Sequence, residues 1–123
     1  MIEYIFSPDS PAPTAPYSPA VRAGDFIFVS GQAVVGTDVK AETRQVLTNI
    51  RAVLAAAGAT FADVVRCGVY LMKADDFQAM NEVYAEFFGN TKPARSTIIV
   101  AALPLKNAKI EIDMVAYKPS GSR

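Results

Sequence analysis

The stretch KAETRQVLTNIRAVLAAAG, residues 40–58, is the most regular part of this chain. Its apolar residues return every three or four positions, and Gly58 is a natural stop for a helix. These apolar positions are Val46, Leu47, Ile50, Val53, Leu54 and Ala57. The pattern predicts an amphipathic helix, and such a helix needs another layer against which to bury its apolar stripe.

Strands are predicted on both sides of this helix. Before it, VRAGDFIFVSGQ at 21–32 predicts two short strands around a turn at Ala23-Gly24-Asp25. After it, DVVRCGVYLM at 63–72 is rich in β-branched and aromatic residues. Residues 109–117 predict a last strand, in which Ile110, Ile112 and Met114 alternate with Lys109, Glu111 and Asp113.

A second helix and a strand that is apolar on both faces complete the predicted order of elements. DDFQAMNEVYAEFFG at 75–89 predicts a helix capped by Asp75 or Asp76, and the inner face of this helix holds Phe77, Met80, Tyr84 and Phe87 or Phe88. Residues 97–103 predict a strand that is apolar on both faces. The order predicts an α+β fold, a mixed sheet with two helices on one face. No further element is left to cover the other face, so we expect a homo-oligomer that closes sheet against sheet.

The N-terminal segment is rich in proline. Residues 7–19, SPDSPAPTAPYSP, hold five of the eight prolines. Such a segment can be a polyproline ligand for a partner, but Tyr17 and the apolar residues after it favour an extended loop on the domain's own surface. We expect a single domain over 1–123, with a proline-rich strand and loop at 1–19 and a frayed tail at 118–123.

The charge balance argues against some partners. Twelve basic and twelve acidic residues cancel and are mixed along the chain, whereas nucleic-acid binding needs a basic stripe. The apolar run at the N-terminus is too short for a signal peptide, and no apolar run is long enough to span a membrane. The single cysteine, Cys67, excludes an internal disulfide and fits a reducing compartment. We expect a soluble, cytoplasmic protein that binds neither nucleic acid nor membrane.

The available side chains narrow the chemistry. The chain has no histidine, which removes the Ser-His-Asp and Cys-His systems and the common zinc sites. Cys67 is better explained as a small buried hydrophobe than as a nucleophile, because no base is apparent beside it. Arg95 lies at the entrance to an apolar stretch, where its charged guanidinium is expected to pair with an anion. Glu111 interrupts an apolar strand that we expect to pair beside the Arg95 strand. It is either a functional residue or the partner in a salt bridge between subunits, for instance with Arg95.

Six stretches, spread over nearly the whole chain, follow the order of one known family. They are APYSPAV at 15–21, FIFVSGQ at 26–32, TRQVLTNIRAVLAAAGATFADVV at 43–65, DFQAMNEVYAEFF at 76–88, PARSTIIVAALP at 93–104 and KIEIDMVAY at 109–117. Together they resemble the Rid family of enamine/imine deaminases (RidA-like), also called the ribonuclease L-PSP or translation-inhibitor family. The resemblance implies a chorismate-mutase-like fold, assembled as a homotrimer around a central barrel, with sites in the clefts between subunits. It also implies that water attacks the imine tautomer of a small 2-aminoacrylate-like enamine to give a 2-oxo acid and ammonia, with no cofactor and no metal.

The resemblance assigns roles to individual residues. Arg95 matches the arginine that binds the substrate carboxylate, for which a planar fork of donors is suited. Glu111 matches the acid that holds the hydrolytic water and handles protons, work that needs a pKa lifted toward neutrality. Tyr17 matches a site tyrosine. Other matches are Ser30 and Gly31 in the pocket wall, Thr97 through its backbone, and Asn81, which is also typical of an amide on a helix surface.

Several departures from the family pattern lie near these residues. Ala15 and Pro19 replace a usual glycine and glutamine, and the segment between Gln32 and the first helix is short. The sequence therefore predicts the reaction class better than the substrate. One alternative is a pathway-specific deaminase of a larger substrate such as 2-aminomuconate, which a second basic group in the pocket would favour. Another is a non-catalytic, 2-oxo acid-binding or chaperone-like trimer. The ribonuclease activity in the family's name is disfavoured by the zero net charge and the lack of histidine.

Overall fold

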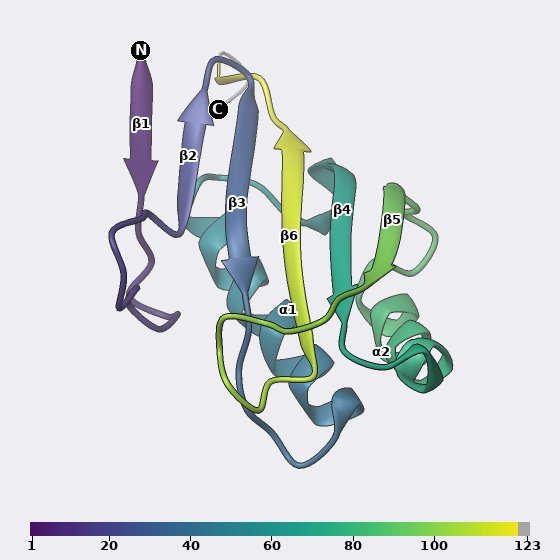
Figure 1. Ribbon diagram of the computed structural model, residues 1–123. Helices are drawn as coiled ribbons and strands as arrows, with labels where there is room; N and C mark the ends of the chain where they lie inside the picture. Colours follow the sequence, from purple (N-terminus) through teal and green to yellow (C-terminus); the bar gives the residue numbers. More distant parts are fainter. Residues whose placement is uncertain (121–123) are drawn as a thin grey trace.

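One mixed sheet forms the body of the molecule (Figure 1). A computed structural model describes residues 1–120 of the chain, and the end of the predicted frayed tail, residues 121–123, lies outside them. The six strands lie in the order β1-β2-β3-β6-β4-β5, and only β4 and β5 are parallel. They are β1 (Ile2–Ile5), β2 (Ala20–Ala23), β3 (Phe26–Gln32), β4 (Val64–Leu71), β5 (Ala94–Ile99) and β6 (Ile110–Tyr117).

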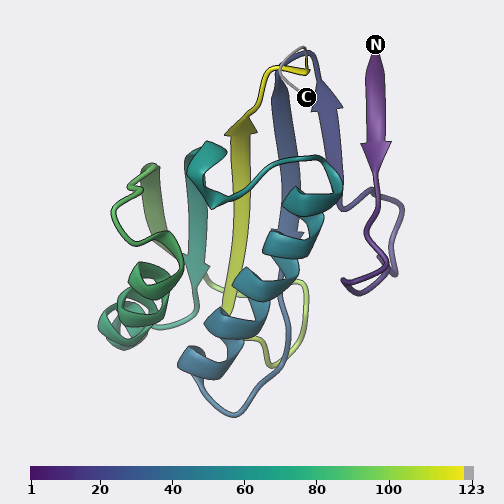
Figure 2. The same cartoon turned by 180° about the vertical axis from the view of Figure 1, so that it is seen from behind.

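Both long helices cover the same face of this sheet, as predicted (Figure 2). Helix α1 (Val39–Ala56) begins at Asp38, whose carboxylate accepts a hydrogen bond of 2.8 Å from the Ala41 backbone N–H. All six apolar positions that predict this helix are buried. Helix α2 (Phe77–Phe88) follows β4, and the short 3₁₀ helices η1 (Phe61–Asp63) and η2 (Ala74–Asp76) precede β4 and α2. No helix within residues 1–120 is long and apolar enough to cross a membrane.

The alternation of β6 places its side chains as the sequence predicts. Ile110, Ile112 and Met114 are buried toward the helices, which leaves Glu111 and Asp113 on the opposite face. The predicted turn before β3 is also present, with Gly24 at φ 61°. We call the side of the sheet that carries Glu111 the open face, because no helix within residues 1–120 covers it.

The strand expected at 97–103 is wrong in its bounds and its neighbours. It begins earlier, because Ala94, Arg95 and Ser96 pair with β4, and it ends at Ile99. The residues after it form a loop that includes Pro104, which has no N–H to donate to a ladder, and Asn107 at φ 71°. This strand, β5, is an edge strand paired with β4 alone, so Glu111 on β6 is not beside it.

Two smaller expectations for α2 also fail. Asp76 is the residue before the helix, but its side chain makes no capping hydrogen bond. Phe77 is 39% exposed instead of facing the core, because it occupies the first helical position at the outer end of α2. Met80 and Phe88 are buried as predicted, and Tyr84 and Phe87 pack partly against the core.

Large apolar side chains gather on the open face. Strand pairing places Tyr4 in line with Phe28, and Ile2 in line with Phe26 and Tyr117. The side chains of this face that are exposed by 42% or more are Ile2, Tyr4, Phe26, Phe28, Ile98 and Tyr117. Several large apolar side chains exposed on one face are typical of a protein interface.

A buried carboxylate holds two loops together at the end of the sheet where β6 begins. Glu42, in the first turn of α1, is fully buried. Its Oε1 accepts a hydrogen bond of 2.7 Å from the Lys109 N–H, and its Oε2 accepts one of 3.1 Å from the Gly36 N–H. Lys109 Nζ lies 3.2 Å from Oε2 and supplies the counter-charge. Glu42 thus ties the β3–α1 loop and the loop before β6 to the helix.

We expect Glu42→Gln to destabilise the fold by about 1–3 kcal/mol, because an NH₂ group would then face buried donors. Urea unfolding at a fixed protomer concentration measures the loss. Glu82→Gln is the matched control, since it breaks only an exposed ion pair with Lys40 of 2.9 Å and should leave stability nearly unchanged. Equal stability of the two variants would contradict the role assigned to Glu42.

Candidate active site

Four of the residues predicted for the site surround one cavity on the open face. Tyr17, Ser30, Gly31 and Glu111 line a space of about 240 Å³ together with Pro104. A neighbouring space of about 360 Å³ shares Tyr17, Gly31, Pro104 and Glu111 and extends along the proline-rich loop. The loop before β6 and the N-terminal loop therefore meet at Glu111, and we call this region the Glu111 cavity.

A β-bulge in β3 shapes this cavity. Val29 pairs with Met114 and Gln32 with Ile112, so Ser30 and Gly31 together oppose the single residue Asp113. The bulge brings Gly31 against the Glu111 carboxyl group, where a methyl group on residue 31 would overlap Oε2. Only glycine leaves room for the Glu111 side chain in its present place.

Ser30 fixes the proline-rich loop at the same point. Its hydroxyl donates a hydrogen bond of 2.6 Å to the Ser18 carbonyl, and its N–H donates one of 2.9 Å to the Pro19 carbonyl. These two bonds pin the loop to β3 and bring Tyr17 beside Gly31. Both donors of Ser30, the hydroxyl and the N–H, are thus bonded to backbone carbonyls, and the residue stabilises the cavity wall.

The surroundings of Glu111 favour its protonated form. Burial, followed by the negative charge of Asp113, raises the pKa of Glu111 above the ordinary 4.5. Asp113 is held in place by the Tyr70 hydroxyl at 3.0 Å and the Gly68 N–H at 3.1 Å. A carboxyl group with a raised pKa exchanges protons more readily near neutral pH, which is what a general acid–base group requires.

Arg95 and Asn81 line a different cavity, of about 340 Å³, between α2 and β5. The Arg95 guanidinium lies over the Tyr84 ring at 4.7 Å and the Phe77 ring at 5.8 Å. Its Nη1 is 3.9 Å from the Met80 sulfur. Within residues 1–120 it has no ion pair, so the guanidinium is available to an anion.

Within one chain, Arg95 and Glu111 lie on opposite faces of the sheet. Arg95 pairs with Cys67, which is buried toward the helices, whereas Glu111 pairs with Tyr70 on the open face. Strand spacing and register put their Cα atoms about 14 Å apart. Thr97 lies on β5 on the same side as Arg95, two residues along. The predicted site residues therefore form two groups, Tyr17 with Ser30, Gly31 and Glu111, and Arg95 with Asn81 and Thr97.

Cys67 lies buried in the core, as predicted. Burial raises the pKa of its thiol, and burial likewise raises the pKa of the nearby Tyr84 hydroxyl. A protonated thiol inside the core is a poor nucleophile, so the reactive groups of this chain lie elsewhere.

Asp113 and Tyr70 were not predicted as members of the site. The alternation along residues 109–117 predicts only that Asp113 lies opposite the apolar face, but the carboxylate is partly buried and accepts two hydrogen bonds. The two-residue spacing between Glu111 and Asp113 on one strand places both on the same face, which is the feature that reveals their coupling. The partner Tyr70 depends on strand pairing and is not apparent from spacing alone.

Comparison with known proteins identifies the family. The model of the family described as endoribonuclease L-PSP matches residues 7–118. The chain belongs to this family. A RutC family protein of Pyrococcus horikoshii is 48% identical over 126 residues, which cover 96% of this chain and 99% of that protein.

Two further relatives of this L-PSP family chain bear on chemistry. A protein of Dermatophagoides farinae named 2-iminobutanoate/2-iminopropanoate deaminase is 40% identical and covers 90% of this chain and 92% of its own length. The crystal structure of E. coli TdcF with bound serine has a TM-score of 0.89 and 32% identity, over 94% of this chain and 98% of TdcF. The predicted Rid-type family and α+β fold are thereby confirmed, and some relatives are named as deaminases.

We expect Asp113→Asn to lower the pKa of Glu111 while leaving it above the ordinary value, because burial, the larger cause, remains. Titration of the ¹³C-labelled carboxyl groups by NMR measures this shift. Asp25→Asn, at the exposed turn before β3, is the matched control and should leave the Glu111 titration unchanged.

The raised pKa of Glu111 also determines whether the folding stability rises or falls with pH. Between pH 4.5 and the folded-state pKa of Glu111, the folded protein binds more protons than the unfolded chain. The contribution of Glu111 to stability therefore falls as the pH rises through this window, and Asp113→Asn should make that fall smaller. A steeper fall in the variant would contradict the coupling.

Proposed function

We propose that this protein is a hydrolytic deaminase of small reactive 2-enamines and 2-imines, and that it releases 2-oxo acids and ammonia. The observation that carries the proposal is the Glu111 carboxyl group, which has a raised pKa and lies against Gly31 in a cavity beside Tyr17. Such a group can accept a proton from water and return it within the same reaction. The deaminase name of the Dermatophagoides relative supports the same chemistry.

In this reaction the Glu111 carboxylate accepts a proton from water while the water oxygen bonds to the imine carbon. Glu111 returns that proton to the imine nitrogen, which gives a carbinolamine and regenerates the carboxylate. Glu111 then passes a proton from the hydroxyl group to the nitrogen, the C–N bond breaks, and ammonia leaves as the carbonyl forms. Tyr17 lies where its hydroxyl can orient the water or the nitrogen. The sum is one water consumed and one ammonia released, with no redox change.

We further propose that the substrate carboxylate is bound by Arg95 of a neighbouring subunit. Arg95 lacks an ion-pair partner within residues 1–120, and its planar fork suits a carboxylate. It lies on the other face of the sheet from Glu111, so one chain does not bring both to a small ligand. A homotrimer, in which apolar open faces pack around a central barrel, supplies Arg95, Asn81 and Thr97 from one subunit and Glu111 from the next. The serine bound by TdcF also carries a carboxylate.

One observation favours a second candidate, a deaminase of a larger dicarboxylate such as 2-aminomuconate. Lys92 lines the same cavity as Arg95, and it is the second basic group that such a substrate would require. Comparing imines with apolar and with carboxylate-bearing side chains distinguishes the two candidates. Faster turnover of the carboxylate-bearing imine, lost in Lys92→Met, would favour the dicarboxylate.

We expect Glu111→Gln to slow ammonia release from enzymatically generated 2-imino acids by about 10²–10⁴-fold after subtraction of the uncatalysed rate. Binding of pyruvate, measured by calorimetry, should persist, because Arg95 remains. If the protein only binds 2-oxo acids, the wild type will match the uncatalysed rate. Full activity in the folded variant would remove Glu111 from proton transfer.

Mixed assemblies test whether the site is shared between subunits. Arg95→Ala and Glu111→Gln subunits, each inactive alone, should regain activity when they are unfolded, mixed and refolded together. In random trimers about a quarter of the sites would then hold both native side chains. Mixing Arg95→Ala with the double variant should restore nothing. Sedimentation must show the assembly, and a stable monomer with full wild-type activity would contradict a shared site.

A further inference from the structure

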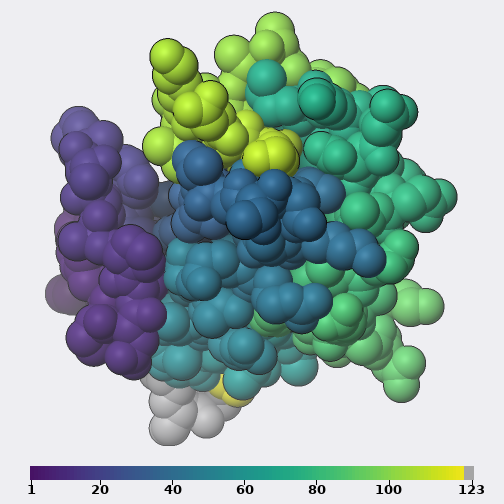
Figure 3. Space-filling model, turned by 90° about the horizontal axis from the view of Figure 1, so that it is seen from below, coloured from purple at the N-terminus to yellow at the C-terminus, as the bar shows by residue number. Residues whose placement is uncertain are grey.

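A second cavity lies on the helix side of the sheet, behind the Glu111 cavity. It has a volume of about 180 Å³ and is enclosed by the proline-rich loop, the end of β3 and the middle of α1. In the view from below, the purple N-terminal segment forms a lobe beside the blue residues of the β3–α1 loop and α1 (Figure 3). The lining residues are Pro11, Ala12, Pro13, Thr14, Tyr17, Gly31, Gln32, Ala33 and Asn49. We call this space the Asn49 cavity.

Asn49 gives this cavity an unused hydrogen-bond donor. The residue is 3% exposed, and its Oδ1 accepts a hydrogen bond of 2.9 Å from Gln45 Nε2. That bond fixes the orientation of the amide, which leaves Nδ2 buried without a partner among residues 1–120. Buried polar groups are nearly always paired, so an unpaired NH₂ on a cavity wall indicates that a ligand or water completes it.

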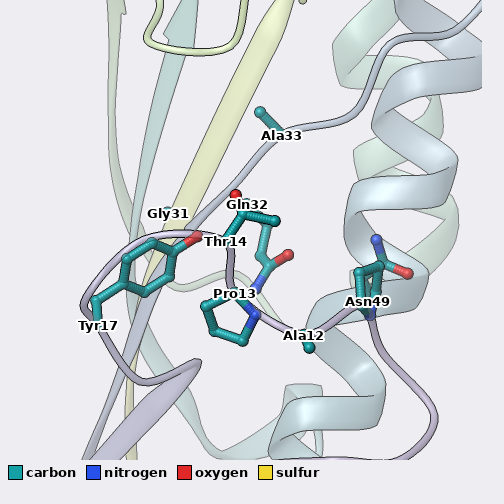
Figure 4. A pocket seen from close by; sticks show the side chains of 9 residues that line it. Ala12, Pro13, Thr14, Tyr17, Gly31, Gln32, Ala33 and Asn49 are labelled. Atoms are coloured by element: carbon teal, nitrogen blue, oxygen red, sulfur yellow. The ribbon is translucent and has the colours of Figure 1, made fainter.

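Gln32 supplies a second amide from the opposite wall. The β-bulge at Ser30 and Gly31 turns Gln32 toward the helix layer, in register with Ile112. Gln32 and Asn49 reach toward each other from β3 and α1, with Pro13 beside the Gln32 amide (Figure 4). The cavity therefore offers neutral polar groups, the amides of Gln32 and Asn49 among them, beside proline and alanine residues.

The charge of the lining selects the kind of ligand. Apart from the Tyr17 phenol, none of the nine lining residues is ionisable. A carboxylate or ammonium group would enter this cavity without a counter-charge and would lose its hydration. A neutral amide fits, because its carbonyl accepts from Asn49 Nδ2 while its NH₂ donates to the Gln32 oxygen.

We propose that the Asn49 cavity is a second binding site, which takes a small neutral molecule bearing a primary amide. It is formed within one chain, and Asn49 and Gln32 belong to it and not to the Glu111 cavity. It shares Tyr17 and Gly31 with the Glu111 cavity, so the two ligands would contact the same wall. The inference rests on neither the proposed reaction nor the assembly.

Acetamide is the probe, with acetate as its charged counterpart of similar shape. In the full-length ¹⁵N-labelled protein, the Asn49 side-chain NH₂ resonances should shift with acetamide and saturate in the millimolar range, and acetate should not move them. Gln32→Leu should weaken the affinity by about tenfold. Gln78→Leu, which removes an exposed amide from α2, is the matched control and should leave the acetamide-induced shifts unchanged.

Two results would overturn the site. An Asn49 NH₂ that shows no saturable shift into the high millimolar range would mean that water alone pairs with it. Equal responses to acetamide and acetate would mean that the lining does not select a neutral ligand. Glu111→Gln should bind acetamide like the wild type, so that loss of turnover and loss of this site are separately visible.

Discussion

The β-bulge at Ser30 and Gly31 is the constraint on which both cavities depend. Two residues oppose Asp113 at this point, and the extra residue reverses which face the following side chain takes. Without it, Gln32 would lie on the open face beside Glu111, and the helix side would lose one of its two amides. With it, glycine meets the Glu111 carboxyl group on one side, and Gln32 meets Asn49 on the other. A one-residue insertion in a single strand thus creates two chemically different spaces.

The division of charges between the two faces is the observation that supports the proposed site between subunits. The pKa of Glu111 is raised by burial and by the negative charge of Asp113. A carboxylate-binding guanidinium at the same spot would form an ion pair with Glu111 and lower its pKa. Within the chain, the position of Arg95 on the other face of the sheet keeps it apart from Glu111. The proposed contact between subunits would bring the two side chains to one ligand.

The local elements were predictable from the sequence, whereas the long-range pairing was not. The spacing of apolar residues predicts α1, and the alternation from Ile110 to Met114 predicts which face of β6 is buried, because both patterns are local. The position of β6 between β3 and β4, away from β5, depends on chain topology. The sequence therefore wrongly set Glu111 next to the Arg95 strand. The grouping of Tyr17, Ser30, Gly31 and Glu111 followed the family resemblance, while Tyr70 and Asp113 depended on the register of β4 and β6.

The charged residues that stabilise the fold differ from those of the candidate site in their hydrogen-bond partners. Glu42 accepts hydrogen bonds from two backbone N–H groups and Lys109, and the buried Arg22 donates to the carbonyls of Ala57 at 2.9 Å and Lys118 at 2.7 Å. These two charges hold loops and chain ends, and their polar atoms are largely used. Glu111, by contrast, accepts no hydrogen bond within residues 1–120, and the closest polar contact of Arg95 there is a thioether sulfur. Glu42 and Arg22 thus stabilise the fold, whereas Glu111 and Arg95 retain polar atoms with which a ligand can pair.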